Sequence, residues 1–234
     1  MTPTAIASLL PRPIRNHLIY FEGRIEAALE AFARSLPAGA RILDAGAGEA
    51  RHREVFEKQR YVAVDLAVGD AAWNYGKLDA LADLCALPFR DASFDAAINI
   101  VTLEHVRDPA AAIREIARTL KPGARVFLAI PQDWEVHQAP HDYFRYTRYG
   151  IEHLLRSAGM TPVRVVASGG YFRLVSRRLL NGIQFFKGGW RWLLFLPAAI
   201  CLGLPALVLP LFEPLDRERN FTLGYLCEAL RNSA

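Results

Sequence analysis

The feature that most constrains the fold is the ten-residue run RILDAGAGEA at residues 41–50. Its apolar first half predicts a buried strand, and Gly46 and Gly48 predict a tight turn directly after that strand. Such a turn would leave backbone N–H groups at a helix start, beside the carboxylate of Asp44. We expect this geometry to suit a ligand that carries a cationic amino group and a ribose-adenine. A dinucleotide is the first alternative, although its G-x-G-x-x-G pattern needs a glycine where Arg51 stands.

Predicted strands and helices alternate along the chain, which indicates a mostly parallel sheet. The expected strands are residues 41–45, 61–65, 80–85, 94–101, 124–130, 161–167 and 221–227. The expected helices are residues 25–36, 49–58 and 109–120 and a helix capped by Thr147. The fold class is therefore α/β, with a Rossmann-like seven-stranded sheet, helices on both faces and an apolar hairpin insertion before the last strand. Ligands of such sheets bind beyond the carboxyl ends of the strands.

A series of motifs in the first two thirds of the chain resembles the class I S-adenosylmethionine (SAM)-dependent methyltransferases, in particular their type 11 small-molecule group. The motifs are LDAGAG at 43–48, DLCALPF at 83–89, SFD at 93–95, LEHV at 103–106, DP at 108–109 and LKPG at 120–123. The resemblance covers about residues 41–159, and the set in this order is specific although no single motif is. Ala50 departs from the pattern, because the family usually has a third glycine there.

The resemblance implies that SAM is the cofactor and assigns roles within its site. Asp44 and the backbone of Gly46 and Gly48 would hold the methionine end. Asp65 would accept both ribose hydroxyls, as a carboxylate can, and Leu66 beside it is expected in the same site.

The resemblance also assigns residues of the third and fourth predicted strands to the adenine and methyl ends of the cofactor site. Asp83 would accept the adenine amino group, and Leu84 would lie against the ring. Asn99, at the end of the fourth strand, would line the sulfonium and its methyl group. The alternative is that these polar residues cap ordinary loops.

The methyl acceptor is expected near the segment 131–147, which follows a strand and is rich in histidine and aromatic residues. Our candidate catalytic residues are His105, His141 and Tyr146. Histidine titrates near neutral pH and suits a general base that removes an acceptor proton. His137 and His141 have a spacing that metal ligands can share, but the sequence offers no third clear ligand, so no metal is expected. Each of these residues could instead pack in the core.

Composition limits the choice of partners. The net charge of +4 is too small to indicate nucleic acid. The three cysteines, Cys85, Cys201 and Cys227, are scattered, which gives no disulfide framework and favours a reducing compartment. No signal peptide is expected from the first ten residues.

Residues 193–212 form a run of twenty residues without a charge. The run is long enough to span a bilayer, but it contains three prolines and precedes a strand that must return to the same sheet. We therefore expect a re-entrant or interfacial hairpin, bent near residues 203–205, with Arg191, Trp190 and Trp192 at the headgroup level. A buried hairpin, a dimer face and a true span are the alternatives.

These expectations combine into one organisation for the chain. A single methyltransferase domain would comprise an N-terminal helical cap at 1–40, a SAM-binding core at 41–168, a membrane-associating insertion at 184–216 and a last strand at 217–234. The expected activity is methyl transfer to a small or lipid-linked acceptor, such as a hydroxyl of a glycan or quinone precursor. We expect a cytoplasmic protein held peripherally or monotopically on the inner face of the membrane. The alternatives are a non-catalytic SAM-binding scaffold or sensor and a nicotinamide dehydrogenase.

Overall fold

The computed structural model describes residues 19–70 and 72–233 and contains a seven-stranded sheet with helices. The strands are β1 (Arg41–Ala45), β2 (Arg60–Asp65), β3 (Ala80–Leu81), β4 (Phe94–Ile100), β5 (Leu120–Pro131), β6 (Met160–Ala167) and β7 (Gly224–Arg231). The α-helices are α3 (Tyr20–Ser35), α4 (Pro109–Thr119), α5 (Arg148–Ser157), α6 (Tyr171–Gly182) and α7 (Trp192–Val208). Short 3₁₀ helices are η1 (Arg53–Phe56), η2 (Tyr75–Lys77), η3 (Leu103–His105), η4 (Ile183–Phe186), η5 (Gly189–Arg191) and η6 (Leu209–Leu215).

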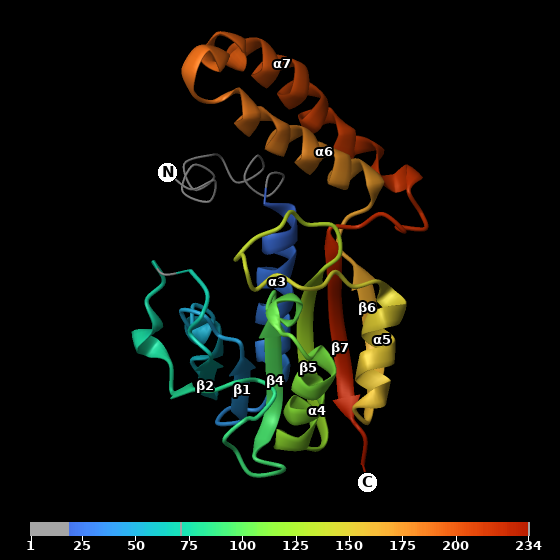
Figure 1. Cartoon of the computed structure of the whole chain (residues 1–234). Coiled ribbons are helices and arrows are strands. Elements are labelled where there is room, and N and C mark those ends of the chain that lie inside the picture. Colours follow the sequence, from blue (N-terminus) through green and yellow to red (C-terminus); the bar gives the residue numbers. More distant parts are fainter. Residues whose placement is uncertain (1–18, 71, 234) are drawn as a thin grey trace. The chain divides into compact units, whose positions relative to one another are not determined.

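The strand order is β3-β2-β1-β4-β5-β7-β6, and the pairs among β1 to β5 are parallel (Figure 1). The last strand runs the other way, because the Ser168 amide donates to Gly224 and the Asn232 amide donates to Gly159 at the two ends of the β6–β7 pair. The order reverses between β1 and β4, so the topological switch point lies beside the glycine turn. The predicted α/β class, with a Rossmann-like and mostly parallel seven-stranded sheet, is confirmed.

Local signals explain the helices that flank the sheet. The Asp108 carboxylate accepts from the Ala111 amide at the start of α4, and Pro109 occupies its first turn. The Thr147 hydroxyl accepts from the Gly150 amide at the start of α5. On the other side, Phe32 of α3 packs against Phe127 of β5 with ring centroids 5.8 Å apart. The core lies between these helices and the buried central strands.

Several boundaries differ from those expected. The helix predicted at residues 49–58 is wrong: Gly48 and Ala50 both have left-handed backbone angles, and only η1 forms after them. The third strand is shorter than predicted, β5 already begins at Leu120, and β7 begins at Gly224 rather than at residue 221. The first eighteen residues of the predicted N-terminal cap lie outside the described residues.

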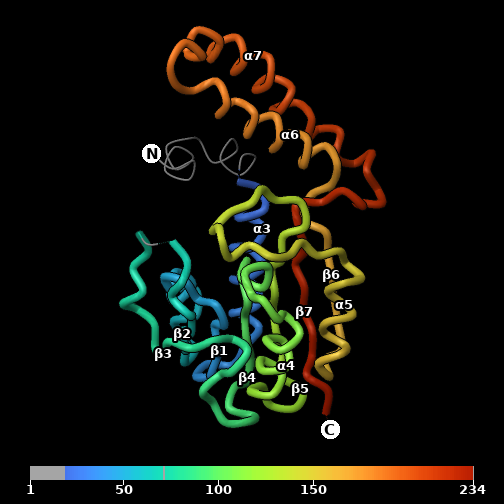
Figure 2. The backbone as a smooth tube through the Cα atoms, in the orientation of Figure 1, coloured from blue at the N-terminus to red at the C-terminus, as the bar shows by residue number. Residues whose placement is uncertain are grey.

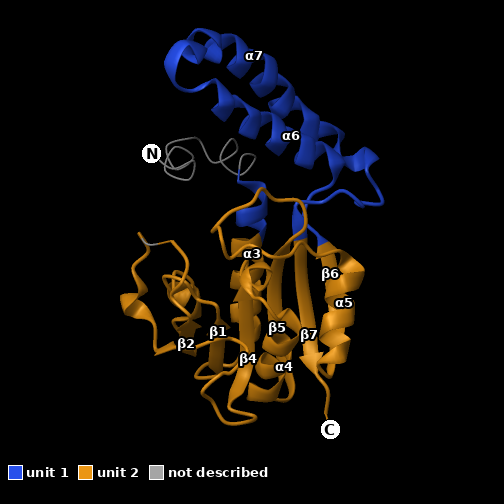
Figure 3. Cartoon of the chain, viewed as in Figure 1, with its two compact units in different colours: residues 1–24, 167–224 blue, residues 25–166, 225–234 orange. Residues whose placement is uncertain are grey.

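The chain divides into two compact units instead of the single domain we expected (Figure 3). One unit comprises residues 25–166 and 225–234, and the other comprises residues 1–24 and 167–224. The insertion is therefore longer than the predicted 184–216, because it includes all of α6.

The insertion is a helical hairpin, but its turn is not at residues 203–205. α6 and η4 form one arm, η5, α7 and η6 form the other, and the chain reverses between Lys187 and Gly189. α7 continues through Pro197 and Pro205. The Ser176 hydroxyl of α6 donates to the Ala206 carbonyl at 2.6 Å. In a helix this carbonyl would accept from the amide of residue 210, but Pro210 has no N–H to donate. Glu213 and Asp216 close the hairpin by accepting amide hydrogens at the start of α6.

Candidate active site

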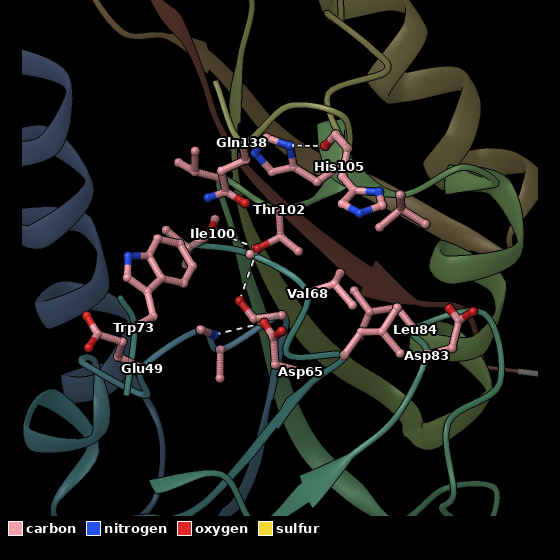
Figure 4. A pocket seen from close by; sticks show the side chains of 18 of the residues that line it. Glu49, Asp65, Val68, Trp73, Asp83, Leu84, Ile100, Thr102, His105 and Gln138 are labelled. Atoms are coloured by element: carbon pink, nitrogen blue, oxygen red, sulfur yellow. Dashed lines mark hydrogen bonds between the residues drawn. The ribbon is translucent and has the colours of Figure 1, made fainter. Parts of the chain in front are cut away.

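A cavity of about 440 Å³ lies at the carboxyl ends of the parallel strands (Figure 4). Eight of the residues predicted from the sequence line it, namely Gly46, Gly48, Asp65, Leu66, Asp83, Leu84, His105 and His141. The three other predicted residues, Asp44, Asn99 and Tyr146, do not line it. Most of the polar residues predicted at the strand ends therefore meet at one cavity, but not all of them reach it.

The glycine turn joins three strands closely. Gly46 has a φ of +88°, and a Cβ there would lie 2.2 Å from Thr102 Cγ2, so only glycine fits. The Gly46 and Ala47 amides donate to the Val64 carbonyl at 2.8 and 3.0 Å. The Thr102 hydroxyl donates to the Gly46 carbonyl at 3.0 Å. The prediction that this turn presents its N–H groups to a ligand is thus wrong for Gly46 and Ala47, whose hydrogens serve β2.

Asp65 ends β2 and connects the glycine turn to the next loop. Its Oδ2 accepts from the Gly48 amide at 2.9 Å, and its Oδ1 accepts from the Ala67 amide at 2.7 Å. A carboxylate oxygen has more than one acceptor site, so both oxygens can still accept a hydroxyl hydrogen from the cavity. Leu66, which follows Asp65, is 51% exposed and offers an apolar surface there.

Asp83 and Leu84 form a second polar and apolar pair. Asp83 Oδ1 accepts from the Cys85 amide at 2.8 Å, which fixes the loop, and Leu84 is buried against the cavity. Burial raises the pKa of the Cys85 thiol to about 11, so this cysteine stays protonated. Figure 4 shows Asp65, Asp83 and Leu84 at one end of the cavity and Gln138 at the other.

Asp44 lies behind the cavity wall. It is 1% exposed, and the Tyr61 hydroxyl donates to its Oδ2. Its Oδ1 has no hydrogen-bond partner among the described residues. Burial raises the pKa of Asp44 to about 7. The β1–β2 packing therefore encloses the carboxyl group, and the contact of this side chain with the methionine end stays a prediction.

Asn99 and Tyr146 are also structural neighbours of the cavity. The Asn99 amide donates to the Ala45 carbonyl at 2.7 Å, and the residue is fully buried. The Tyr146 hydroxyl donates to the Leu103 carbonyl at 3.1 Å, and burial raises its pKa. Neither side chain lines the cavity, so the predicted role of Asn99 at the sulfonium and the predicted catalytic role of Tyr146 stay predictions. Ile100, Val101 and Thr102 line the cavity instead.

The segment 132–147, which crosses the edge of the sheet in Figure 2, supplies part of the opposite end of the cavity. The Tyr143 hydroxyl accepts from Arg107 Nε at 3.0 Å and lies 3.0 Å from Nδ1 of His141. His105 Nδ1 lies 2.6 Å from the His141 carbonyl, and burial lowers the pKa of His105. Nε2 of His141 has no hydrogen-bond partner among the described residues. Both ring nitrogens of His105, in contrast, lie within hydrogen-bond distance of another atom, the His141 carbonyl oxygen or Nε2 of His137.

Sequence reasoning missed several residues of the cavity wall, including Arg51, His52, Trp73, Thr102 and Gln138. Trp73 closes over the glycine turn, since a Cβ on Gly48 would lie 3.3 Å from its ring. Burial, with Arg51 beside it, lowers the pKa of His52 to about 4, so that ring is neutral. The aromatic residue in a loop after the second strand was the one available signal.

Comparison with known proteins agrees with this geometry. A family model described as "Methyltransferase domain" matches residues 43–128. A ubiquinone biosynthesis O-methyltransferase of Xanthomonas oryzae pv. oryzae is 37% identical over 105 residues, which are 39% of this chain and 43% of the relative. A tRNA (carboxymethyluridine(34)-5-O)-methyltransferase of Arabidopsis thaliana is 32% identical over 113 residues, 46% of this chain and 27% of the relative. The chain spans less than half the length of these curated relatives.

Solved structures share the fold. The Burkholderia thailandensis 1,6-didemethyltoxoflavin-N1-methyltransferase, solved with its namesake compound and S-adenosylhomocysteine, has a TM-score of 0.55 and 19% identity over 100% of this chain and 92% of its own. The [4+2]-cyclase SpnF has a TM-score of 0.56 and 19% identity over 88% of this chain and 82% of its own. At such identities the likeness concerns the fold.

The sheet order and the acidic strand ends define a class I SAM-dependent methyltransferase fold. Residues 43–128 match the methyltransferase domain family, and the cofactor of this SAM-dependent methyltransferase fold is SAM. The donor set fits SAM, because Asp65 offers a carboxylate to a ribose diol and Asp83 with Leu84 offers an acceptor beside an apolar face.

Proposed function

We propose that this protein transfers the methyl group of SAM to a hydroxyl of a small or lipid-linked acceptor, such as a glycan or quinone precursor. The observation that carries the proposal is one cavity lined both by the carboxylates of Asp65 and Asp83 and by His141, Tyr143 and Arg107. The ubiquinone O-methyltransferase relative supports a hydroxyl as the accepting group.

In this proposal Asp65 binds the ribose hydroxyls, and Asp83 binds the adenine amino group with Leu84 against the ring. The Gly46–Gly48 turn lies at the methionine end, and the missing side chain of Gly46 lets Thr102 of the cavity wall pack against the turn. SAM supplies a methyl group that its sulfonium activates for in-line displacement. The protein's main contribution to such a reaction is position and orientation.

His141 is the proposed general base. Its Nδ1 contacts Tyr143, and Tyr143 is held by Arg107, so the ring has a fixed orientation. With the proton on Nδ1, Nε2 has a lone pair for the acceptor hydroxyl hydrogen. The new bond from oxygen to methyl carbon then forms as the sulfur–carbon bond breaks, and the proton remains on His141. His105 is a positioning residue in this arrangement, because both of its nitrogens have close neighbours.

Calorimetry with SAM, followed by transfer of a labelled methyl group to a membrane extract, tests the proposal. We expect SAM to bind, Asp65→Asn to weaken binding at least tenfold, and the extract to yield a labelled hydroxyl-methylated product. Asp70→Asn, on the exposed loop after β2, is the matched control and should bind as the wild type does. SAM binding without label transfer to any fraction would favour the scaffold or sensor, and no SAM binding would refute both.

We further propose that the insertion holds the protein on the inner face of a membrane, from the cytoplasmic side. Residues 189–215 form a helical segment long and apolar enough to cross a bilayer, identified among the described residues. Its apolar side chains are largely exposed; Leu193, for example, is 81% exposed and Leu211 is 76% exposed. Trp190 and Trp192 are also exposed, as expected of aromatic residues at a membrane interface.

The ends of the insertion favour interfacial binding over a single crossing. The Ser168 amide donates to the Gly224 carbonyl at 2.8 Å, so the insertion leaves and returns at one place. Arg173 and Arg177 of α6 are engaged within the same compact unit, over the Tyr20 ring and with Glu22. Arg191, directly before α7, is exposed and suits anionic headgroups, whereas α7 suits the acyl boundary.

Flotation of the full chain with vesicles tests this second part. We expect binding to vesicles with anionic lipid, and a strong loss of binding when Leu196 and Leu204 of α7 are both replaced by glutamate. Val163→Glu, at an exposed apolar position of β6, is the control for added charge. Equal flotation of the α7 variant and the wild type would refute the membrane role and leave the methyltransferase proposal standing.

A further inference from the structure

Three side chains beside the cavity face one another although they are far apart in the sequence. Glu104 and His105 come from η3, and His137 comes from the segment that follows β5. Nε2 of His105 lies 3.0 Å from Nε2 of His137. One carboxylate oxygen of Glu104, Oε1, lies 3.7 Å from the first nitrogen and 3.8 Å from the second.

The opposite nitrogens define the protonation of the two rings. Nδ1 of His105 lies 2.6 Å from the His141 carbonyl, and Nδ1 of His137 lies 3.1 Å from the Glu135 carbonyl. A carbonyl oxygen only accepts, so each Nδ1 carries a hydrogen. In the neutral rings both Nε2 atoms then present lone pairs to each other at hydrogen-bond distance. A positive charge between them would make this contact favourable.

The carboxyl group of Glu104 would match such a positive charge. Its side chain is 0% exposed, and neither carboxylate oxygen has a hydrogen-bond partner among the described residues. Arg145, a cation on the neighbouring segment, binds both oxygens of Asp142 instead, at 2.6 and 2.8 Å. A buried carboxylate without a partner is costly unless a cation compensates it.

We propose that Glu104, His105 and His137 form a binding site for a divalent first-row transition metal ion of the zinc type. Two imidazole nitrogens and one carboxylate are a ligand set for such ions. Ligand atoms about 2.0–2.1 Å from a tetrahedral ion are about 3.3 Å apart, close to the spacing of these three atoms. The Nδ1 bonds to carbonyls are the outer contacts that commonly orient metal-bound histidines.

The site has an entry path, because the His137 side chain is 24% exposed. With three protein ligands, a tetrahedral ion has one position left for a further ligand. His105 also lines the cavity. If that position faces the cavity, which rests on the proposed function, an acceptor oxygen is the ligand it would take.

Metal binding by the full chain tests the proposal without any activity measurement. After treatment with chelator, the protein is titrated with Zn²⁺ by calorimetry and with Co²⁺ by absorption spectroscopy. We expect one equivalent of Zn²⁺ and visible Co²⁺ bands without a sulfur charge-transfer band. His137→Gln and Glu104→Gln should each weaken binding at least tenfold. His153→Gln, an exposed histidine of α5, should bind as the wild type does.

Thermal unfolding in chelator checks that the variants are folded. If Glu104→Gln does not fold, His137→Gln still tests the proposal, because His137 lies on a partly exposed loop. No Zn²⁺ binding by the wild type would assign the short contact to a shared proton and overturn the proposal. Equal affinity of wild type and His137→Gln would also overturn it, as would loss of binding in Cys85→Ser. Loss of SAM binding alone would refute the proposed function and leave this site intact.

Discussion

The Tyr61 hydroxyl of β2 donates a hydrogen bond to the Asp44 carboxyl group at the end of β1. Both groups are buried, and the pKa of Asp44 rises to about 7 because burial outweighs this bond. The first acidic residue of the motif is thus held by the sheet itself.

The raised pKa makes stability depend on pH. Between about pH 4 and 7 the folded state retains a proton that the unfolded state releases, so stability falls as pH rises through this window. About three pKa units correspond to roughly 4 kcal/mol, in order of magnitude. We expect urea unfolding at several pH values to show the wild type losing stability relative to Asp44→Asn as pH rises from 4 to 7. If the unfolding free energies of the two proteins changed with pH in the same way, the buried position of Asp44 would be contradicted.

The close approach at Gly46 predicts a large effect of a single methyl group. Gly46→Ala adds a strained φ and a clash with Thr102, whereas Gly39→Ala adds a strained φ of +76° with nothing within 4 Å. We expect Gly39→Ala to cost about 1 kcal/mol of unfolding free energy and Gly46→Ala at least about 3 kcal/mol. Denaturant unfolding of both variants measures the difference, and similar losses would mean that the clash is relieved.

Ala50 has a φ of +55° at the position where a glycine was expected. Ala50→Gly should therefore stabilise the protein by about 1 kcal/mol, because glycine adopts this angle without strain. Ala112→Gly, in the interior of α4, is the contrasting control and should destabilise by at least about 1 kcal/mol. A loss of stability in Ala50→Gly would show that its buried methyl group matters more than the strain.

The proposed base predicts a kinetic split. His141→Gln should lower kcat for the acceptor about a hundredfold or more while the affinity for SAM is unchanged. His153→Gln provides the comparison, and a His141→Gln variant with the wild-type kcat would exclude the general-base role.

Local signals made much of the fold predictable from the sequence. Asp108-Pro109 and Thr147 are caps that depend on a few neighbouring residues, and the helices α4 and α5 begin where they indicate. The polar ends of β2 and the Asp83 loop were predictable because parallel strands bring their carboxyl ends to one edge. The absence of the helix expected after residue 49 was not predictable, because alanine rarely adopts the left-handed φ that Ala50 has here.

Contacts across long stretches of chain were beyond the sequence. The spacing noted in the sequence was that of His137 and His141, four residues apart, for which no metal was expected, whereas the structure pairs His137 with His105, 32 residues away. Asp44 and Tyr146 have residue types suited to a site, yet burial turns both toward backbone or core partners. Proline suggested a bend in the apolar run, but α7 accommodates both prolines.

The hydrogen bond between Ser168 and Gly224 has a consequence for how such a chain can change. The two ends of a 55-residue excursion meet as neighbours in a ladder, so the register of the last two strands does not depend on what lies between them. An insertion of this kind can be shortened, exchanged or acquired while the pairing of the strands in the sheet is kept. The proposed membrane-binding segment can therefore change in evolution separately from the catalytic site.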